Sequence, residues 1–214
     1  MKKSLLVTGG GSGIGAAVAR LAAADAVLAD IAKAGGNAFA VQADVSREEG
    51  VLRLFKEADA RLGPLTALVN NAGMIEPQTR VENMDAARLT RVFATNVVGS
   101  FLCAHEAVLR MSTKRGGKDG AIVNISSRAA GLGSPNEFVD YAASKGAIET
   151  FTICLAKEVA TEGIRVNAVR PGLIHADIHA SGGGPEEVAQ SLLWLLSDAS
   201  SYVTSTFIDV SGGR

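Results

Sequence analysis

Short apolar runs alternate with amphipathic stretches along the whole chain. The runs that predict buried strands are 4–8, 37–43, 65–71, 120–127, 164–170 and 206–212. Apolar residues recur at helical spacing from about Ile14 and in the stretches 46–63, 85–111, 140–163 and 185–198. Short apolar strands separated by helices are typical of a parallel sheet that is covered on both faces. The 214 residues contain no repeat, low-complexity segment or linker, so we expect a single domain, 1–214.

A glycine-rich loop joins the first predicted strand to the first predicted helix. Its sequence is TGGGSGIG, residues 8–15. Gly9 permits a tight turn, Gly13 lets a pyrophosphate approach the backbone, and Gly15 allows the helix to pack closely on the strand. The free N–H groups at the start of the helix would face the phosphates. A loop of this kind between a strand and a helix predicts a dinucleotide-binding domain.

A tyrosine and a lysine lie four residues apart in YAASKG, residues 141–146. Helical spacing puts Tyr141 and Lys145 on one face of their helix. A phenol has a pKa near 10, so a role as base near neutral pH needs a shift of about 3 units, worth roughly 4 kcal/mol. A neighbouring ammonium group and a nicotinium cation would both favour the phenolate. Tyr141 is therefore a candidate acid/base group.

The preceding predicted strand ends in two serines, at the sheet edge where the glycine loop is also expected. A serine hydroxyl there could hold a substrate carbonyl or hydroxyl group. Side chains alternate along a strand, so only one of Ser126 and Ser127 can face the site. We favour Ser127 and keep Ser126 as the alternative.

These motifs resemble those of the short-chain dehydrogenase/reductase family, in its classical type, to which glucose dehydrogenases and 3-oxoacyl reductases belong. The matching pieces, in family order, are TGGGSGIG, Asp44-Val45, NNAG (70–73), Asn96, NISS (124–127), YAASK (141–145) and RPGLI (170–174). The resemblance implies an α/β fold with a doubly wound parallel sheet of the Rossmann type. It also implies NAD or NADP as the cofactor, and Ser12 weakly favours NAD because NADP-preferring relatives often carry a basic residue there.

The resemblance implies roles for individual residues. Tyr141 would be the general acid/base, and Lys145 would bind the cofactor ribose and depress the pKa of the tyrosine. Ser127 would orient the substrate, and Asn96 would belong to a proton relay through water. The implied cofactor-binding residues are Gly9, Gly13, Ile14, Gly15, Asp44, Val45, Asn71, Ala72, Gly73, Tyr141, Lys145, Pro171, Gly172 and Ile174.

The stretch AVLADI (26–31) resembles a strand that ends in an acid, but the spacing argues against it. A strand there would leave only about six residues before the next predicted strand, whereas a parallel crossover needs about a dozen or more. We interpret AVLADIAKAG as the end of a helix that closes at Gly35-Gly36. Asp30, about twenty residues beyond the glycine loop, is therefore left out of the predicted site.

The second strand of the fold is then missing from this chain, and so is the substrate lid that the family carries before the helix at 185–198. We expect the missing residues at Ala24/Asp25 and at Gly183/Gly184. Two explanations stay open: omission of residues that the protein possesses, or a true deletion with the sheet closed again. An absent strand would leave a slot of roughly 10 Å that backbone hydrogen bonds cannot bridge.

Composition narrows the choice of partners. The net charge is −1 with no basic block, which argues against nucleic acid and anionic membrane surfaces. No apolar run approaches the ~18 residues of a membrane span, so we expect a cytoplasmic protein. The family suggests a homo-oligomer, a tetramer or a dimer. No metal site is expected, because His175, Asp177 and His179 fit a solvated loop better than a metal cluster.

The sequence therefore predicts an NAD(P)-dependent oxidoreductase that transfers a hydride between nicotinamide and a carbonyl or secondary alcohol. The alternative is a catalytically silent sensor or scaffold that binds the cofactor. The combination of Ser127, Tyr141 and Lys145 favours the enzyme, because a scaffold would not need the three together.

Overall fold

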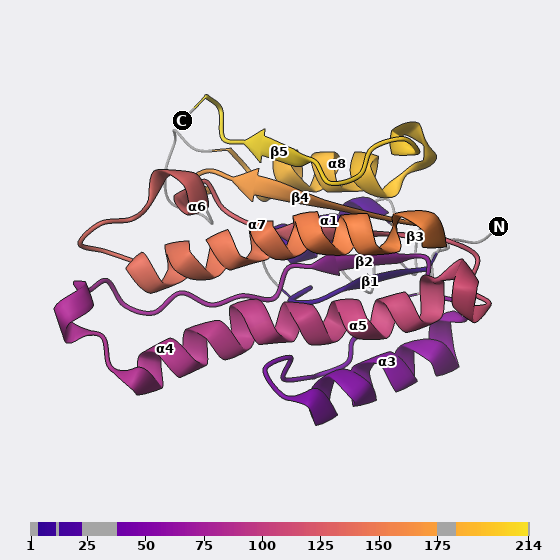
Figure 1. Ribbon diagram of the computed structural model, residues 1–214, viewed down its shortest axis with the longest axis horizontal. Helices are drawn as coiled ribbons and strands as arrows, with labels where there is room; N and C mark the ends of the chain where they lie inside the picture. Colours follow the sequence, from indigo (N-terminus) through magenta and orange to yellow (C-terminus); the bar gives the residue numbers. More distant parts are fainter. Residues whose placement is uncertain (1–3, 12, 23–37, 175–182, 214) are drawn as a thin grey trace.

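Five strands form one parallel sheet in the order β1-β2-β3-β4-β5 (Figure 1). The computed structural model describes residues 4–11, 13–22, 38–174 and 183–213. The strands are β1 Leu5–Val7, β2 Ala67–Asn70, β3 Gly120–Ile125, β4 Ile164–Pro171 and β5 Phe207–Val210. Because the strands are parallel and in register, their carboxyl ends lie along one edge, as the pairs Val7↔Val69 and Asn70↔Asn124 show.

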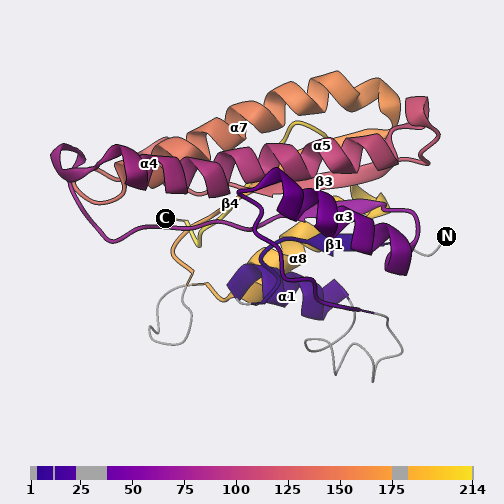
Figure 2. The same ribbon diagram turned by 90° about the horizontal axis from the view of Figure 1, so that it is seen from below.

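Helices cover both faces of this sheet (Figure 2). They are α1 Gly13–Ala22, α3 Glu48–Leu62, α4 Ala86–Phe93, α5 Gly99–Met111, α6 Ala129–Leu132, α7 Val139–Val159 and α8 Pro185–Leu196. Helices α3, α5 and α7 bury their apolar sides on one face of the sheet, and α1 and α8 pack on the other. The predicted α/β Rossmann-type sheet is confirmed.

Alternate strand residues divide the core into two clusters. Leu68 and Ile122 face α3, α5 and α7, whereas Val69 and Val123 face α1 and α8. Successive side chains of a strand point to opposite faces, which is why these central strands are apolar at consecutive positions. The buried pattern leaves polar side chains mainly at the strand ends, where the candidate site lies.

The predicted strand at 37–43 is wrong for the residues that the structure describes, 38–43, which form no strand. Val41 and Ala43 pack on the core, and the carbonyl of Gln42 accepts a hydrogen bond from Arg53 Nη2 (2.5 Å) instead of a strand partner. β1 is the edge of the described sheet. Without a strand beside β1, residues 38–43 have no ladder to join.

The helix predicted at 46–63 is present as α3, with a later start. α3 begins at Glu48 with Arg47 in the N-cap position, and no side chain caps it. The N–H and hydroxyl of Ser46 donate instead to Asp44 Oδ1, at 3.0 and 2.7 Å. Ser46 therefore donates to the Asp44 carboxylate, a strong local acceptor, and does not cap the start of the helix.

The predicted long helix at 85–111 is present as two helices joined by a π-helical turn. α4 leads through Ala94–Val98 directly into α5. The stretch Ala86–Met111 is long enough for a membrane span, and an 18-residue window within it reaches a mean hydropathy of 1.4. Cys103 and Met111 nevertheless lie in the core beneath the sheet, as expected of the core helix of a globular fold.

The interpretation of AVLADIAKAG, Asp30 and the junction Ala24/Asp25 concerns residues outside the described part of the chain. At the second junction, Gly183 pairs with Ile174 in an isolated parallel bridge. Gly184 then occupies the N-cap position of α8, and its N–H donates to Glu187 Oε2 (2.8 Å). Gly183 and the start of α8 therefore lie beside Ile174, in the loop after β4.

Candidate active site

The carboxyl ends of the strands bring the predicted residues together at one edge of the sheet. Ser127 follows β3, and Pro171 ends β4 beside it, since the N–H of Arg128 donates to the Pro171 carbonyl (3.0 Å). A cavity of about 570 Å³ opens there. Its lining includes Ser127, Pro171, Gly172 and Ile174. This is the place where ligands of open α/β sheets bind.

Tyr141 and Lys145 lie on the first two turns of α7 and face this edge. The Lys145 ammonium lies 5.6 Å from the centre of the Tyr141 ring and donates to the carbonyl of Ile125 (2.8 Å). Ser127 makes a side-chain hydrogen bond with Tyr141. Ser126 instead donates to Glu149 Oε1 (2.9 Å) on the far side of Lys145. Of the two serines, the structure thus brings Ser127 to the tyrosine.

Burial shifts the pKa values of both groups. Burial raises the pKa of Tyr141, and the hydrogen bond from Ser127 lowers it only in part. Lys145 is 4% exposed, and burial lowers the pKa of its ammonium group to about 8. In this structure the Tyr141 phenol is therefore protonated at neutral pH, whereas the resemblance to the family implied a lowered pKa.

Asn96 lies in the π-helical turn between α4 and α5 and is almost fully buried. Its Oδ1 accepts from the N–H of Met74 (2.7 Å), and its Nδ2 donates to the Met74 carbonyl and to Ser144 Oγ, both at 3.0 Å. A Cβ on Gly73 would lie 3.4 Å from Asn96 Oδ1 and 3.6 Å from Lys145 Nζ. Gly73 therefore lies close to both Asn96 and Lys145.

The glycine loop is held by backbone contacts to the segment after β2. Gly9 has a φ of +65° and Gly13 a φ of +51°, which only glycine adopts readily. A Cβ on Gly15 would lie 2.4 Å from the Gly9 carbonyl oxygen, so only glycine fits. A Cβ on Gly13 would meet nothing within 4 Å, which leaves open space above the start of α1.

Asn71 and Ala72 form hydrogen bonds with the glycine loop. Asn71 Nδ2 donates to the carbonyls of Thr8 (3.0 Å) and Gly9 (3.2 Å). The Thr8 hydroxyl accepts the N–H groups of Asn71 (3.0 Å) and Ala72 (2.9 Å). Thr8 was not among the predicted residues, although its place as the first residue of TGGGSGIG is a readable signal.

The remaining predicted residues lie around these two centres. Asp44 is exposed, and the hydrogen bonds from Ser46 lower the pKa of its carboxyl group. Val45 is buried, and its carbonyl oxygen packs against Gly99. A Cβ on Gly99 would lie 2.9 Å from this oxygen. Ile14 and Ile174 pack against the cluster beneath α1 and α8. The N–H of Gly172 donates to the Val210 carbonyl (2.9 Å), which fixes the loop after β4.

The residues fit a dinucleotide along this edge. The open space over Gly13 at the start of α1 suits a pyrophosphate, because helix N–H groups there lack intrahelical partners. The loop after Pro171 lines the cavity, and Gly73 lies close to Lys145, with a Cβ on Gly73 3.6 Å from Lys145 Nζ. Among the described residues, no three His, Cys, Asp or Glu side chains gather in a geometry that could hold a metal ion.

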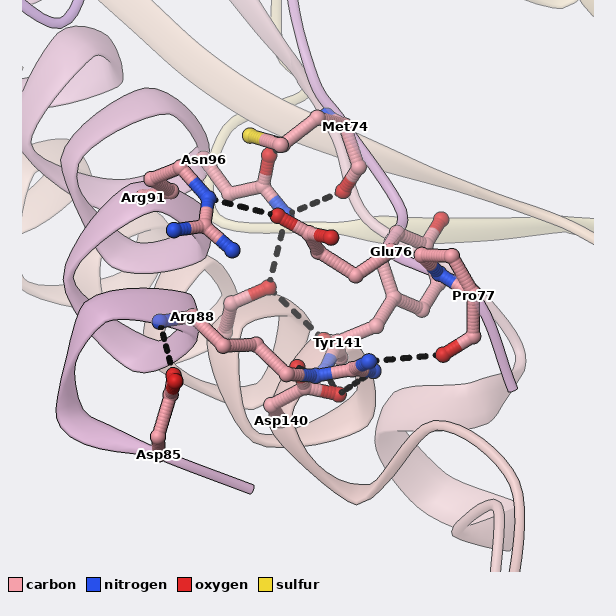
Figure 3. Close-up of polar contacts among 10 residues, drawn as sticks. Met74, Glu76, Pro77, Asp85, Arg88, Arg91, Asn96, Asp140 and Tyr141 are labelled. Atoms are coloured by element: carbon pink, nitrogen blue, oxygen red, sulfur yellow. Dashed lines mark hydrogen bonds and ion pairs between the residues drawn. The ribbon is translucent and has the colours of Figure 1, made fainter. Parts of the chain in front are cut away.

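A buried ion pair next to Tyr141 was not predicted. Arg88 on α4 binds Asp140 at the start of α7, and both are at least nine-tenths buried (Figure 3). The sequence holds a signal for it: Arg88, Val92 and Asn96 lie four residues apart and share the inward face of the helix. A charged residue on an apolar helix face needs a buried partner.

Comparisons with known proteins agree with this geometry. Residues 3–184 match the family described as short chain dehydrogenase. An uncharacterized oxidoreductase of Escherichia coli strain K12, YgfF, is 51% identical over 98% of this chain and 98% of its own length. A cis-4-hydroxycyclohexanecarboxylate dehydrogenase of Sinomonas cyclohexanicum is 37% identical over 97% of this chain and 94% of its own.

Among solved structures, a 3-ketoacyl-(acyl-carrier-protein) reductase from Brucella melitensis complexed with NADH superposes with a TM-score of 0.89. It is 29% identical and covers 99% of this chain and 98% of its own. The chain thus belongs to the short-chain dehydrogenase/reductase family, as its motifs indicated. It is an α/β oxidoreductase of the classical type.

The alignments also show that relatives carry residues that this chain lacks. The alignment with the Escherichia coli oxidoreductase spans 243 residues, 29 more than the 214 of this chain. At least 29 positions of that relative therefore have no counterpart here.

Proposed function

We propose that the protein is an NAD(P)-dependent oxidoreductase that interconverts a secondary alcohol and a ketone, with Tyr141 as the general acid/base. The observation that carries the proposal is the arrangement of Ser127, Tyr141 and Lys145 beside the cavity at the carboxyl edge. A phenol next to a hydroxyl group and an ammonium group can move one proton at a substrate oxygen. The relatives that are named as dehydrogenases or reductases support this reaction class.

The residues divide the work as follows. Ser127 would hold the substrate oxygen against the Tyr141 hydroxyl, and Tyr141 would give its proton to a carbonyl or take one from an alcohol. Lys145 would place a positive charge near the phenolate, and Asn96 would fix the segment after β2 through Met74. When bound, the cofactor would supply or accept the hydride at its nicotinamide ring. Gly9, Gly13 and Gly15 would hold its pyrophosphate, and Lys145 its ribose.

The raised pKa of Tyr141 favours one direction at neutral pH. A protonated phenol can donate its proton to a carbonyl oxygen, whereas alcohol oxidation needs the phenolate. We therefore expect carbonyl reduction to be efficient near pH 7 and alcohol oxidation to rise with pH. Reduction and oxidation rates measured between pH 6 and 10 check this, and an oxidation rate that is flat over that range contradicts it.

NAD is the preferred cofactor in this proposal, because Ser12 offers no cation for a 2′-phosphate and the reductase from Brucella melitensis was solved with NADH. The residues that relatives have in addition would correspond to the second strand and the substrate lid. Two observations support this placement: the described sheet ends at β1, and Gly183, just before α8, pairs with Ile174. The intact mass of the purified protein decides between omission and deletion: a deletion predicts 22.0 kDa.

We further propose a cytoplasmic homo-oligomer, a tetramer or a dimer, as the family suggests. Size-exclusion chromatography with light scattering tests the oligomer.

The function is tested with a panel of ketones and secondary alcohols in the presence of NADH, NADPH and their oxidised forms, followed at 340 nm. Tyr141→Phe is the matched variant, because it removes the proton-carrying hydroxyl and keeps the ring. We expect turnover with at least one substrate and a loss of roughly 10²- to 10⁴-fold in Tyr141→Phe. Cofactor binding with no turnover on the panel, or equal turnover in Tyr141→Phe, would instead favour the silent sensor or scaffold.

A further inference from the structure

The ion pair beside Tyr141 is the most fully buried one on this side of the sheet that the described residues form. Arg88 is 8% exposed and Asp140 3%. Arg88 Nε lies 2.7 Å from Asp140 Oδ2, and Arg88 Nη2 lies 3.3 Å from Asp140 Oδ1, a two-point contact (Figure 3). Burial alone would raise the pKa of Asp140, but hydrogen bonds from Arg88 and from the N–H of Tyr141 outweigh it, and the pKa is lowered. Both groups are therefore charged at neutral pH.

Asp140 also holds the backbone of the tyrosine itself. Its Oδ1 accepts the N–H of Tyr141 at 2.9 Å. This matters because Phe138, at the N-cap of α7, offers no side-chain cap, so the first N–H groups of the helix need another acceptor. The Tyr141 carbonyl accepts from Ser144 Oγ (2.7 Å), and Ser144 in turn accepts from Asn96 Nδ2. Both backbone groups of Tyr141 are thus tied to side chains that connect to α4 or to the π-helical turn.

Arg88 extends this connection to a third segment. Its Nη1 donates to the carbonyl of Pro77 at 2.6 Å. Pro77 lies three residues after Met74, which holds Asn96 through both of its backbone groups. The guanidinium group therefore joins α4, the loop after NNAG and the first turn of α7, and each of these carries or contacts a residue of the candidate site.

A second arginine on the same helix provides a built-in comparison. Arg91 binds Glu76 (Nε to Oε1, 2.8 Å) in the same loop, but its side chain is 54% exposed, and among the described residues it makes no hydrogen bond or ion pair with α7. The two arginines hold the same loop, and only Arg88 is joined to the residue before Tyr141 (Figure 3).

We propose that Arg88 and Asp140 are positioning residues that fix the first turn of α7, and with it the hydroxyl of Tyr141 against Ser127. The proposal rests on the proposed function for its kinetic consequence, because it assumes that Tyr141 carries the proton. Neither residue lines the cavity, so the pair acts through the tyrosine and not on the substrate. A small displacement of a proton-transfer group can cost about 10²-fold in rate.

The kinetic test compares Arg88→Met with Arg91→Met on the best substrate of the panel. Arg88→Met should lower kcat by about 10- to 100-fold and leave the KM for the cofactor within about twofold. Arg91→Met should leave both within about twofold, because exposed ion pairs contribute little. Equal kcat in Arg88→Met and in the wild type, with the variant folded by circular dichroism, overturns the proposal.

The double variant Arg88→Met/Asp140→Leu distinguishes a positioning role of the pair from a role in stability alone. Replacing a buried ion pair by apolar side chains often restores stability. If the pair positions Tyr141, the melting temperature recovers and kcat stays low, because no carboxylate holds the Tyr141 N–H. Recovery of kcat together with stability overturns the proposal. Should the Arg88 variants fail to fold, Asp140→Asn takes their place, with the same expected fall in kcat.

A titration decides the matter without cofactor or substrate, so its outcome is independent of the proposed function. The protein has two tyrosines, and Tyr202 is fully exposed, so Tyr202→Phe leaves Tyr141 as the one ionising phenol. Its ionisation is followed at 295 nm after a rapid pH jump. In the double variant, which leaves no unpaired charge beside the ring, we expect the pKa to fall toward about 10, the value of a hydrated phenol. Lys145, the other titratable group at the ring, is the same in both proteins, and with a pKa of about 8 it is neutral where the phenol ionises. An unchanged titration overturns the proposal even if the protein turns over no substrate.

Discussion

The two halves of the carboxyl edge are held together in different ways. In the catalytic half, around β3 and α7, side chains bind other side chains as well as the backbone: Ser127 bonds Tyr141, and Asn96 bonds Ser144. In the glycine-loop half, around β1 and α1, the bonds end on the backbone. Thr8 accepts the N–H groups of the segment after β2, and Asn71 donates to carbonyls of the loop.

The sheet reflects the same difference. β3 has six residues and lies between β2 and β4, so it is paired along both sides. β1 has three residues and is paired with β2 on one side only. A short edge strand contributes fewer ladder hydrogen bonds, so the contacts of Thr8 and Asn71 carry a larger share of the order in that half.

The two halves should therefore differ in how far a substitution can change function without changing stability. Where side chains hold the site, a substitution can remove chemistry and leave the fold intact or even more stable. Where the backbone holds the site, an atom added at a close approach such as Gly15 strikes the main chain, and binding and stability fall together. The following three predictions test this division, from the largest expected effect to the smallest.

Lys145→Met should stabilise the protein near neutral pH and abolish its activity. The pKa of Lys145 is about 8 in the folded protein against about 10.5 unfolded. Below pH 8 the lysine is charged in both states, and its burial costs up to about 3 kcal/mol. Between pH 8 and 10.5 the unfolded state binds more protons, so wild-type stability rises with pH and the advantage of the variant disappears.

Urea unfolding at pH 7 and pH 10 measures this difference, and titrations common to both proteins cancel. Lys157→Met is the control on the same helix, because Lys157 is exposed and its variant should stay within about 0.5 kcal/mol at both pH values. A variant that is less stable than the wild type at pH 7 would show that the hydrogen bond to Ile125 outweighs the cost of burying the charge.

The same division explains what could be read from the sequence. The glycine loop and Tyr141-Lys145 were readable because each depends on local spacing between a strand and a helix or along one helix turn. The contact of Arg88 with Asp140 spans 52 residues and joins two helices, so no local pattern fixes it. Only the placement of Arg88 on an apolar helix face hinted that a partner was needed.

The prediction of a strand at 37–43 was wrong for a related reason. Its apolar pattern is that of a strand, and Val41 and Ala43 do pack on the core. A strand also needs a partner ladder, and the described sheet ends at β1. If the second strand is absent, a gap of about 10 Å separates β1 from residues 37–43, and backbone hydrogen bonds cannot bridge it.

Gly15→Ala should destabilise the glycine-loop half, whereas the same change at Gly146 should not. A Cβ on Gly15 lies 2.4 Å from the Gly9 carbonyl oxygen and 2.5 Å from Asn71 Nδ2, so the loop must move, at about 2 kcal/mol. Gly146 lies within α7, and a Cβ there meets nothing within 4 Å. Gly146→Ala should therefore stabilise the protein by up to about 1 kcal/mol through helix propensity.

Thermal unfolding of both alanine variants, with NAD binding measured by calorimetry, checks the pair. Gly15→Ala should lose NAD affinity together with stability. Gly15→Ala with unchanged stability would mean that the loop yields easily, and the contrast between the two halves would then fail.

Thr8→Val is the smallest and most selective test of the backbone-held half. Valine keeps the shape of threonine and removes the hydroxyl that accepts from Asn71 and Ala72. The N–H of Asn71 keeps its hydrogen bond to the Val69 carbonyl (3.1 Å), whereas the N–H of Ala72 has no second acceptor among the described residues. One poorly satisfied N–H group costs about 1 to 2 kcal/mol, which urea unfolding resolves. Thr8→Ser restores the hydroxyl and should recover most of the loss; if Thr8→Ser is as unstable as Thr8→Val, the methyl group and not the hydroxyl holds the loop.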